Sequence, residues 1–171
     1  MKIAIGSEIY NHLQLGRLKA LSQVDALTGL NNRRAMLRHM ETLAQCPGQP
    51  YGVINIDLNG LKGVNDRDGH EAGDQLLIQA AELLGKVFYR DDLFRTGGDE
   101  FVVIIGGIGR DTFDMKLQRL KSVSEKHGLS MAVGAFWSDG ATDLKTGFRQ
   151  ADTAMYADKA AYYRNHPANR R

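Results

Sequence analysis

A glycine-opened pair of carboxylates between two apolar runs is the feature that most limits the folds open to this chain. The runs 92–96 and 101–105 flank Gly97-Gly98-Asp99-Glu100. Two apolar runs joined by a short glycine-containing loop predict a β-hairpin. The tip of this hairpin carries two acidic side chains. The two glycines beside them have no Cβ atom, so a ligand can approach the backbone closely. Taken alone, the same pattern also fits an ordinary polar turn.

Length and composition predict one globular domain. The chain has 171 residues, of which 43% are hydrophobic and 25% charged, which is enough for a sizeable core. A net charge of +2 gives no argument for a nucleic-acid partner or a membrane surface. Cys46 is the single cysteine, so no intrachain disulfide forms. Without a secretory signal or an apolar run of about 18 residues, we expect a cytoplasmic protein without membrane contact.

The periodicity of apolar residues predicts alternating helices and strands. Helices are expected at about 7–24, 33–44, 71–88 and 111–126, with a last helix that begins at Thr142 or Asp143. Asn31 or Asn32 is expected to cap the 33–44 helix. Strands are expected at 51–57 and 129–137 besides the hairpin, and 59–69 is expected to be a polar turn region.

The resulting β-α-β-β-α-β order predicts an α+β fold. It is the order of ferredoxin-like, palm-type cores, in which helices pack on one face of a central antiparallel sheet. Further helices before and after this core are expected to surround it.

Acidic and amide groups cluster at two places in this predicted fold. Asp57 ends the first strand, which pairs centrally with the hairpin, so we expect it to lie beside Asp99. Two carboxylates on adjacent strands are the minimal holder for one or two Mg²⁺ ions. The segment 65–74 opens the long helix, and it fits either a capping turn or a purine pocket. In a purine pocket, an Asn amide both donates and accepts hydrogen bonds, and a carboxylate accepts from the guanine N1–H and 2-amino groups.

Several segments of the chain, taken in order, carry a family resemblance. They are Asp25-Ala26-Leu27-Thr28-Gly29-Leu30-Asn31-Asn32-Arg33-Arg34, Ile56-Asp57-Leu58-Asn59-Gly60-Leu61-Lys62-Gly63-Val64-Asn65-Asp66, Gly69-His70-Glu71-Ala72-Gly73-Asp74, Phe94-Arg95-Thr96-Gly97-Gly98-Asp99-Glu100-Phe101 and Ala151-Asp152-Thr153-Ala154-Met155-Tyr156-Ala157-Asp158-Lys159. From about residue 18 to 165, the chain resembles the GGDEF-domain diguanylate cyclases, whose nucleotidyl cyclase-like fold has this palm-type core. One such motif often occurs by chance, but the ordered set does not.

The resemblance implies that two GTP molecules are condensed into cyclic di-GMP with release of pyrophosphate. It implies a metal site for Mg²⁺, with Mn²⁺ as the alternative ion, formed by Asp57, Asp99, Glu100 and the backbone carbonyl of Leu58. It implies GTP contacts by Lys62, Asn65, His70, Asp74, Gly97 and Gly98. Asp99, Glu100 and Lys159 are the residues to which it assigns catalysis, with Lys159 on the phosphates.

The resemblance also implies a domain organisation and a partner. Residues 1–24 are expected to form a helix or linker that connects to an upstream sensory domain. Residues 25–166 are expected to form the catalytic domain, and 167–171 a tail. Because each domain holds one GTP, two copies must face each other during turnover, so a homodimer is expected.

The sequence departs from the family pattern at two sites. The family often has an inhibitory R-x-x-D product site, but Phe88 stands at its arginine position before Asp91. This predicts weak or absent product feedback. Near the C-terminus, Tyr163 takes a usual arginine position and Arg164 comes one residue late, which turns it by about 100° on a helix.

These departures leave more than one function open. The first is an active diguanylate cyclase, favoured by the acidic and amide residues that are present. The second is a degenerate GGDEF module that binds GTP and regulates a partner domain. A third is a palm-type nucleotidyl cyclase with a mononucleotide product, against which the signature at 97–101 argues.

Overall fold

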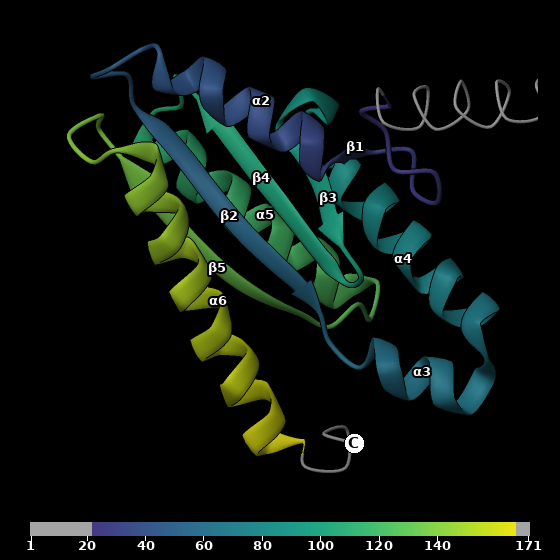
Figure 1. Ribbon diagram of the computed structural model, residues 1–171. Coiled ribbons are helices and arrows are strands. Elements are labelled where there is room, and N and C mark those ends of the chain that lie inside the picture. The colour runs from purple at the N-terminus through teal and green to yellow at the C-terminus, as the bar shows by residue number, and fades with distance from the viewer. Residues whose placement is uncertain (1–21, 167–171) are drawn as a thin grey trace, which may run out of the picture.

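A mixed five-stranded sheet with the order β1-β3-β4-β2-β5 forms the centre of the molecule (Figure 1). The computed structural model describes residues 22–166. The strands are β1 (Asn31–Asn32), β2 (Tyr51–Leu58), β3 (Leu93–Gly97), β4 (Glu100–Gly106) and β5 (Met131–Ser138). The helices are α2 (Arg33–Ala44), α3 (Leu61–Asp68), α4 (His70–Gly85), the 3₁₀ turn η1 (Arg90–Asp92), α5 (Arg110–Lys126) and α6 (Leu144–Asn165).

Strand β2 is an inner strand of the sheet, between β4 and β5. It runs antiparallel to both β4 and β5, while β3 and β4 form the predicted antiparallel hairpin. The short β1 adds to the outer edge of β3 in parallel. Without β1, the strand order is that of the predicted ferredoxin-like core, so the predicted fold class is confirmed.

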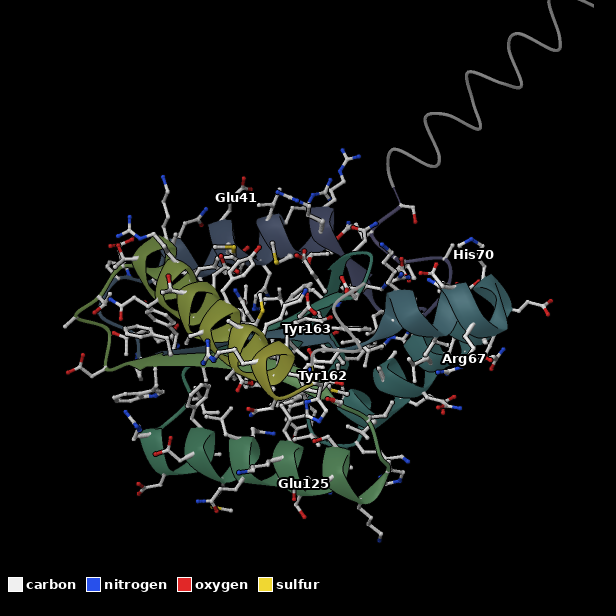
Figure 2. The ribbon with its side chains drawn as sticks, turned by 90° about the horizontal axis from the view of Figure 1, so that it is seen from below. Glu41, Arg67, His70, Glu125, Tyr162 and Tyr163 are labelled. Atoms are coloured by element: carbon white, nitrogen blue, oxygen red, sulfur yellow. The ribbon has the colours of Figure 1, made fainter. Side chains whose placement is uncertain are left out.

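Both faces of the sheet are covered by helices. Because side chains alternate along a strand, Ile54 and Ile56 of β2 face a core formed with α4 and α5. Tyr51 and Val53 face a second core formed with α2 and α6. Figure 2 shows α2, marked by Glu41, and α5, marked by Glu125, on opposite sides of the sheet. The expectation of helices on one face therefore holds only for the core helices α4 and α5.

Helix α6 lies directly on β5, because a glycine of the strand leaves room for the helix backbone. A Cβ atom at Gly134 would come within 2.1 Å of both the Ala151 carbonyl oxygen and the Met155 nitrogen. At the start of the helix, the Asp143 side chain caps the Thr146 N–H at 2.9 Å. This docking carries the last turns of α6 past the end of β2. Within residues 22–166, no helix is both long and apolar enough to cross a membrane.

Most of the predicted elements form close to their expected bounds. Asn32 caps α2 and accepts hydrogen bonds from the Arg34 and Ala35 N–H groups at 3.0 and 3.1 Å. Most of the helix expected at 7–24 lies outside the described residues, although Val24 is described and forms an isolated bridge with Asn31.

The expectation of a polar turn over 59–69 was wrong. The segment contains α3, which buries none of its residues and therefore has no apolar stripe to reveal a helix. Glycines with positive φ bound it on both sides, Gly60 at 77° and Gly69 at 88°. The sequence signals of a turn thus belong to the two ends of a short helix.

Candidate active site

Strand pairing brings Asp57 to the acidic tip of the β3–β4 hairpin. Asp57 lies opposite Glu100 in the register of β2 and β4. The next residue, Leu58, donates its N–H to the Asp99 carbonyl oxygen at 3.0 Å. Asp57 is only 2% exposed, whereas Glu100 is exposed and Asp99 half-buried. One buried carboxylate therefore lies beside two accessible ones, as the strand order predicts.

Lys159 reaches this group from α6. Its Nζ lies 2.7 Å from Asp57 Oδ2, and its side chain is 27% exposed. Helix α6 packs closely on β5 at Met155. Lys159 lies about one helical turn after Met155, so this packing sets its position. The structure thus brings Lys159 and the acidic group together, although more than a hundred residues separate Asp57 from Lys159 in the chain.

The electrostatics of the cluster favour a cation. Burial raises the pKa of the Asp57 carboxyl, the Lys159 hydrogen bond opposes the rise, and the charges of Asp99 and Glu100 add to it. Burial works against the charged Lys159 ammonium, but its hydrogen bond to Asp57 and the acidic charges nearby raise its pKa overall. Lys159 is therefore held in its charged form beside an excess of negative charge.

Asp57 retains an oxygen that the protein does not use. Its Oδ1 is fully buried and has no hydrogen-bond partner among the described residues. Buried polar atoms are rarely left without a partner, so this atom points to a group that the protein alone does not supply. A hard divalent cation such as Mg²⁺ takes carboxylate oxygens and completes its shell with water and substrate phosphates.

The residues of this cluster supply only part of the coordination shell of such an ion. Across residues 22–166, no three His, Cys, Asp or Glu side chains lie close enough together to hold a metal by themselves. Lys159 also occupies one of the two oxygens of Asp57. An ion at Asp57, Asp99 and Glu100 would therefore depend on further oxygen ligands from a bound nucleotide and water.

The glycines of the hairpin turn face open space. A Cβ atom at Gly97 or Gly98 would meet no protein atom within 4 Å. At Gly98 the positive φ of 31° itself favours glycine, whereas at Gly97 neither packing nor a positive φ accounts for the missing side chain. The exposed backbone leaves room for a ligand beside Asp99.

Arg95 holds this turn in place, a role that the sequence motifs did not reveal. Its Nε and Nη2 donate to the Gly98 carbonyl oxygen at 3.1 and 2.7 Å, and its Nη1 donates to Asp25 Oδ1 at 2.9 Å. The same Asp25 oxygen accepts the Thr28 N–H and hydroxyl at 2.9 and 2.7 Å. The turn at 25–30 and the hairpin tip are thus tied together. Both residues lie within the motif segments, but nothing in those motifs indicates that the two contact each other.

The corner between α3 and α4 brings together two residues assigned to guanine. A Cβ atom at Gly73 would lie 1.9 Å from Asn65 Oδ1, so the Asn65 side chain rests on the Gly73 backbone next to Asp74. His70, the first residue of α4, projects from the outer end of this corner (Figure 2). Lys62, His70 and Asp74 are exposed and so remain accessible to a ligand. Because α3 follows β2 directly, this corner lies at the same end of the sheet as Asp57 (Figure 1).

The end of α6 presents a tyrosine where the family pattern has an arginine. Tyr163 lies four residues after Lys159 and so shares its face of the helix, while Arg164 is turned away by about a further 100°. Tyr163 also contacts Tyr162 edge to face, with ring centroids 5.3 Å apart, near the end of the helix (Figure 2). An open hollow of about 530 Å³ lies along Tyr156, Lys159, Ala160, Tyr163 and Arg164. Arg164 thus borders the same hollow as Lys159, but the ion pair with Asp57 is formed by Lys159.

Comparison with known proteins identifies the family. The family model described as "Diguanylate cyclase, GGDEF domain" matches residues 22–165. The chain therefore belongs to the GGDEF-domain family, which the resemblance of its motifs had indicated.

The relatives with curated names include one named as a diguanylate cyclase and one named as a cyclic di-GMP phosphodiesterase. The chain is 30% identical over 163 residues to "Diguanylate cyclase DgcS" of Shewanella oneidensis, covering 90% of this chain and 55% of the relative. It is 33% identical over 154 residues to "Cyclic di-GMP phosphodiesterase PdeR" of Escherichia coli, covering 84% of this chain and 23% of that protein. The chain thus spans about half or less of the length of these relatives.

Solved structures support the fold. A microbial GGDEF domain studied for its interaction with cyclic di-GMP has a TM-score of 0.70 and 30% identity, covering 81% of this chain and 94% of that one. The diguanylate cyclase SiaD of Pseudomonas aeruginosa, in complex with its activator SiaC, has a TM-score of 0.73 and 26% identity. That match covers 94% of this chain and 68% of SiaD.

Proposed function

We propose that this chain is a diguanylate cyclase that converts two GTP molecules into cyclic di-GMP and two pyrophosphates. The observation that carries the proposal is the group at the end of β2, where the buried Asp57 lies in register with Glu100 and contacts Lys159. Membership of the GGDEF family supports the reaction class.

In this proposal, the acidic residues bind Mg²⁺ together with GTP. Asp57, Asp99 and Glu100, with the backbone carbonyl of Leu58, are the oxygen ligands that the chain offers. When bound, the ion neutralises phosphate charge and lowers the pKa of an attacking hydroxyl. The unpartnered, buried oxygen of Asp57 supports this assignment, because a cation would supply its missing partner.

The remaining residues position the nucleotide. Lys159 and Lys62 would attract the phosphates, and the exposed backbone at Gly97 and Gly98 would let them come close. Asn65 and Asp74 would bind the guanine edge, with His70 at the same corner. In each of two equivalent steps, a 3′-oxygen of one GTP bonds to the α-phosphorus of the other. The bond from that phosphorus to the bridging oxygen breaks, the pyrophosphate leaves and the hydroxyl proton is released to solvent.

The product requires two copies of the domain. Each domain would have one nucleotide site. The two 3′-oxygens of cyclic di-GMP come from two different GTP molecules. Two sites must therefore face each other across a homodimer, at least during turnover. An upstream sensory domain is proposed as the regulator of this assembly.

The test is product analysis after incubation of the pure protein with GTP and Mg²⁺. Asp99→Asn keeps the size of the side chain but removes its charge, and Asp139→Asn, in the exposed β5–α6 loop, is the matched control. We expect cyclic di-GMP from the wild type and the control, and a loss of about 100-fold or more in Asp99→Asn, because electrostatic groups in active sites contribute on this scale. Full activity in Asp99→Asn would contradict the proposed metal site.

The alternative is a GGDEF module that binds GTP and regulates a partner. The observation that favours it is Tyr163 at the usual arginine position, which removes one cation from the phosphate side. In that case, a fluorescent GTP analogue would bind while no cyclic di-GMP forms, even at protein concentrations high enough to drive dimer formation. A linear or cyclic mononucleotide product would instead support a different nucleotidyl cyclase.

A further inference from the structure

The last residues of β2 are held from both sides at the point where the chain leaves the sheet. On one side, the Leu58 N–H donates to the Asp99 carbonyl oxygen at 3.0 Å. On the other side, the Asn59 N–H donates to the Ser130 carbonyl oxygen, also at 3.0 Å. Gly60 follows with a φ of 77° and leads the chain into α3. The end of β2 is therefore fixed between the hairpin tip and the residue that precedes β5.

These bonds set the direction of the Leu58 carbonyl group. A trans peptide is planar, so the Leu58 C=O points away from the Asn59 N–H of the same peptide unit. Because that N–H points towards β5, the Leu58 oxygen points towards the hairpin tip that carries Asp99 and Glu100. In a complete antiparallel pair, the Asp99 N–H would return a bond to this oxygen. Among the described residues that return bond is not formed, so the strand ladder does not occupy the oxygen.

The side chain of Asn59 adds a second bond to Ser130. Asn59 Nδ2 donates to Ser130 Oγ at 3.1 Å, beside the backbone bond between the same two residues. One hydrogen bond would let the Leu58–Asn59 peptide rotate about the bond axis, whereas two bonds oppose this rotation. The pair of bonds thus holds the Leu58 carbonyl in one direction.

The surroundings of Asn59 make this second bond hard to replace. Asn59 is only 7% exposed, and its Oδ1 is buried without a partner among residues 22–166. Loss of the Nδ2 bond would leave the whole buried amide unpaired, which favours a reorientation of Asn59 and of the peptide before it. Ser130 itself is exposed, so its hydroxyl can be removed without a cavity in the core.

We propose that Asn59 and Ser130 are positioning residues of the candidate metal site, which hold the Leu58 carbonyl oxygen towards the ion. The inference rests on the proposed function, in which this oxygen is one of the metal ligands. A carbonyl is uncharged, so its value as a ligand depends on its direction more than that of a carboxylate does. Residues that orient metal ligands without touching the metal typically change metal affinity by about 10–100-fold.

The test compares nucleotide binding with and without Mn²⁺ in the wild type and in Ser130→Ala. The probe is a GTP analogue in which a methylene group replaces the oxygen between the α- and β-phosphorus, so pyrophosphate cannot leave. Calorimetry gives its Kd in EDTA and its Kd in Mn²⁺, and the first value divided by the second measures the contribution of the ion. We expect this ratio to fall about tenfold in Ser130→Ala, with the Kd in EDTA unchanged. A purely structural effect would change both Kd values alike.

Two further variants and one spectrum locate the effect. Ser130→Thr keeps the hydroxyl and should restore the wild-type ratio, and Ser122→Ala, at an exposed position of α5, is the matched control that should leave it unchanged. In protein labelled with ¹³C at its leucine carbonyls, electron–nuclear double resonance of bound Mn²⁺ should show a coupled carbon. This coupling should weaken in Ser130→Ala.

The outcomes separate this inference from the proposed function. An unchanged ratio in Ser130→Ala beside a metal-dependent wild type overturns the inference alone, as does a ¹³C coupling that Ser130→Ala leaves intact. Failure of Ser130→Thr to restore the ratio also overturns it, because the hydroxyl would then not be the group that acts. A wild type whose nucleotide binding does not respond to Mn²⁺ overturns the proposed metal site and this inference with it.

Discussion

Replacement of Lys159 by methionine is expected to destabilise the protein and at the same time to make its stability depend on Mg²⁺. Methionine has a similar length but no charge, so it removes the cation that lies 2.7 Å from Asp57 Oδ2. Asp57 would remain 2% exposed beside Asp99 and Glu100, with neither of its oxygens paired by a protein cation.

The size of the effect follows from the burial of the pair. Breaking a buried ion pair costs about 3–5 kcal/mol, but the Lys159 side chain is 27% exposed, which lowers the expected cost to about 2–3 kcal/mol. For a domain of this size, that corresponds to a fall in Tm of roughly 5–10 °C. An ion that binds the freed carboxylate with a Kd of about 1 mM would, at about 10 mM Mg²⁺, restore about 1.4 kcal/mol.

Thermal unfolding of the wild type, Lys159→Met and Lys145→Met, with and without Mg²⁺, measures both effects. Lys145 is an exposed residue near the start of α6, so the same substitution there controls for the loss of a helix lysine. Equal Tm values for the two variants would refute the stabilising role of the pair. A Mg²⁺ response in Lys159→Met no larger than in the wild type would refute competition between the lysine and the ion.

Three further predictions concern residues that support the candidate site. Gly134→Ala should lower stability by about 2–3 kcal/mol and reduce the proposed cyclase activity, because its Cβ would collide with backbone atoms of α6; thermal unfolding and product analysis measure this. Gly73→Ala should weaken GTP binding at least tenfold by displacing Asn65, as titration with a fluorescent GTP analogue would show. At Asp25, burial opposes ionisation, but hydrogen bonds from Thr28 and Arg95 lower the carboxyl pKa below 3.8. The carboxylate therefore stabilises the fold above that pH and ceases to do so as pH falls through its lower folded pKa. Asp25→Asn should cost about 1–2 kcal/mol at pH 7 and reduce the acid sensitivity of Tm.

The sequence predicted the fold wherever burial leaves a periodic pattern. Helices α4 and α5 and the strands β2 to β5 have apolar side chains at helical or strand spacing, because each packs against a core. Helix α3 has no buried residue, so no such pattern exists, and its glycines suggested a turn. Helices α2 and α6 were expected around the core, but the face that they cover was not predicted, because both lie outside the β-α-β-β-α-β unit on which the prediction rested.

The candidate site was predictable only as far as its motifs extend. The position of Asp57 beside the hairpin follows from strand order, since β2 and β4 must pair to bring it there. The contact of Lys159 with Asp57 depends on how closely α6 packs on β5, which is set by the absence of one Cβ at Gly134. The role of Arg95 depends on three-dimensional contacts between segments 70 residues apart. Such contacts leave no local periodic signal.

The missing arginine of the product site is expected to abolish tight binding of cyclic di-GMP beside Asp91. Phe88, at the arginine position, is 3% exposed and packs in the core with α4, so its side chain points away from solvent. Arg90 offers no replacement, because its guanidinium donates to the Gly29 carbonyl oxygen. Calorimetric titration of the wild type and Asp91→Asn with cyclic di-GMP should therefore give the same result. Tight binding that Asp91→Asn abolishes would contradict this reasoning. Phe88→Arg should not restore the site, since it would place an unpaired charge in the core and unfold the domain before it could bind the product.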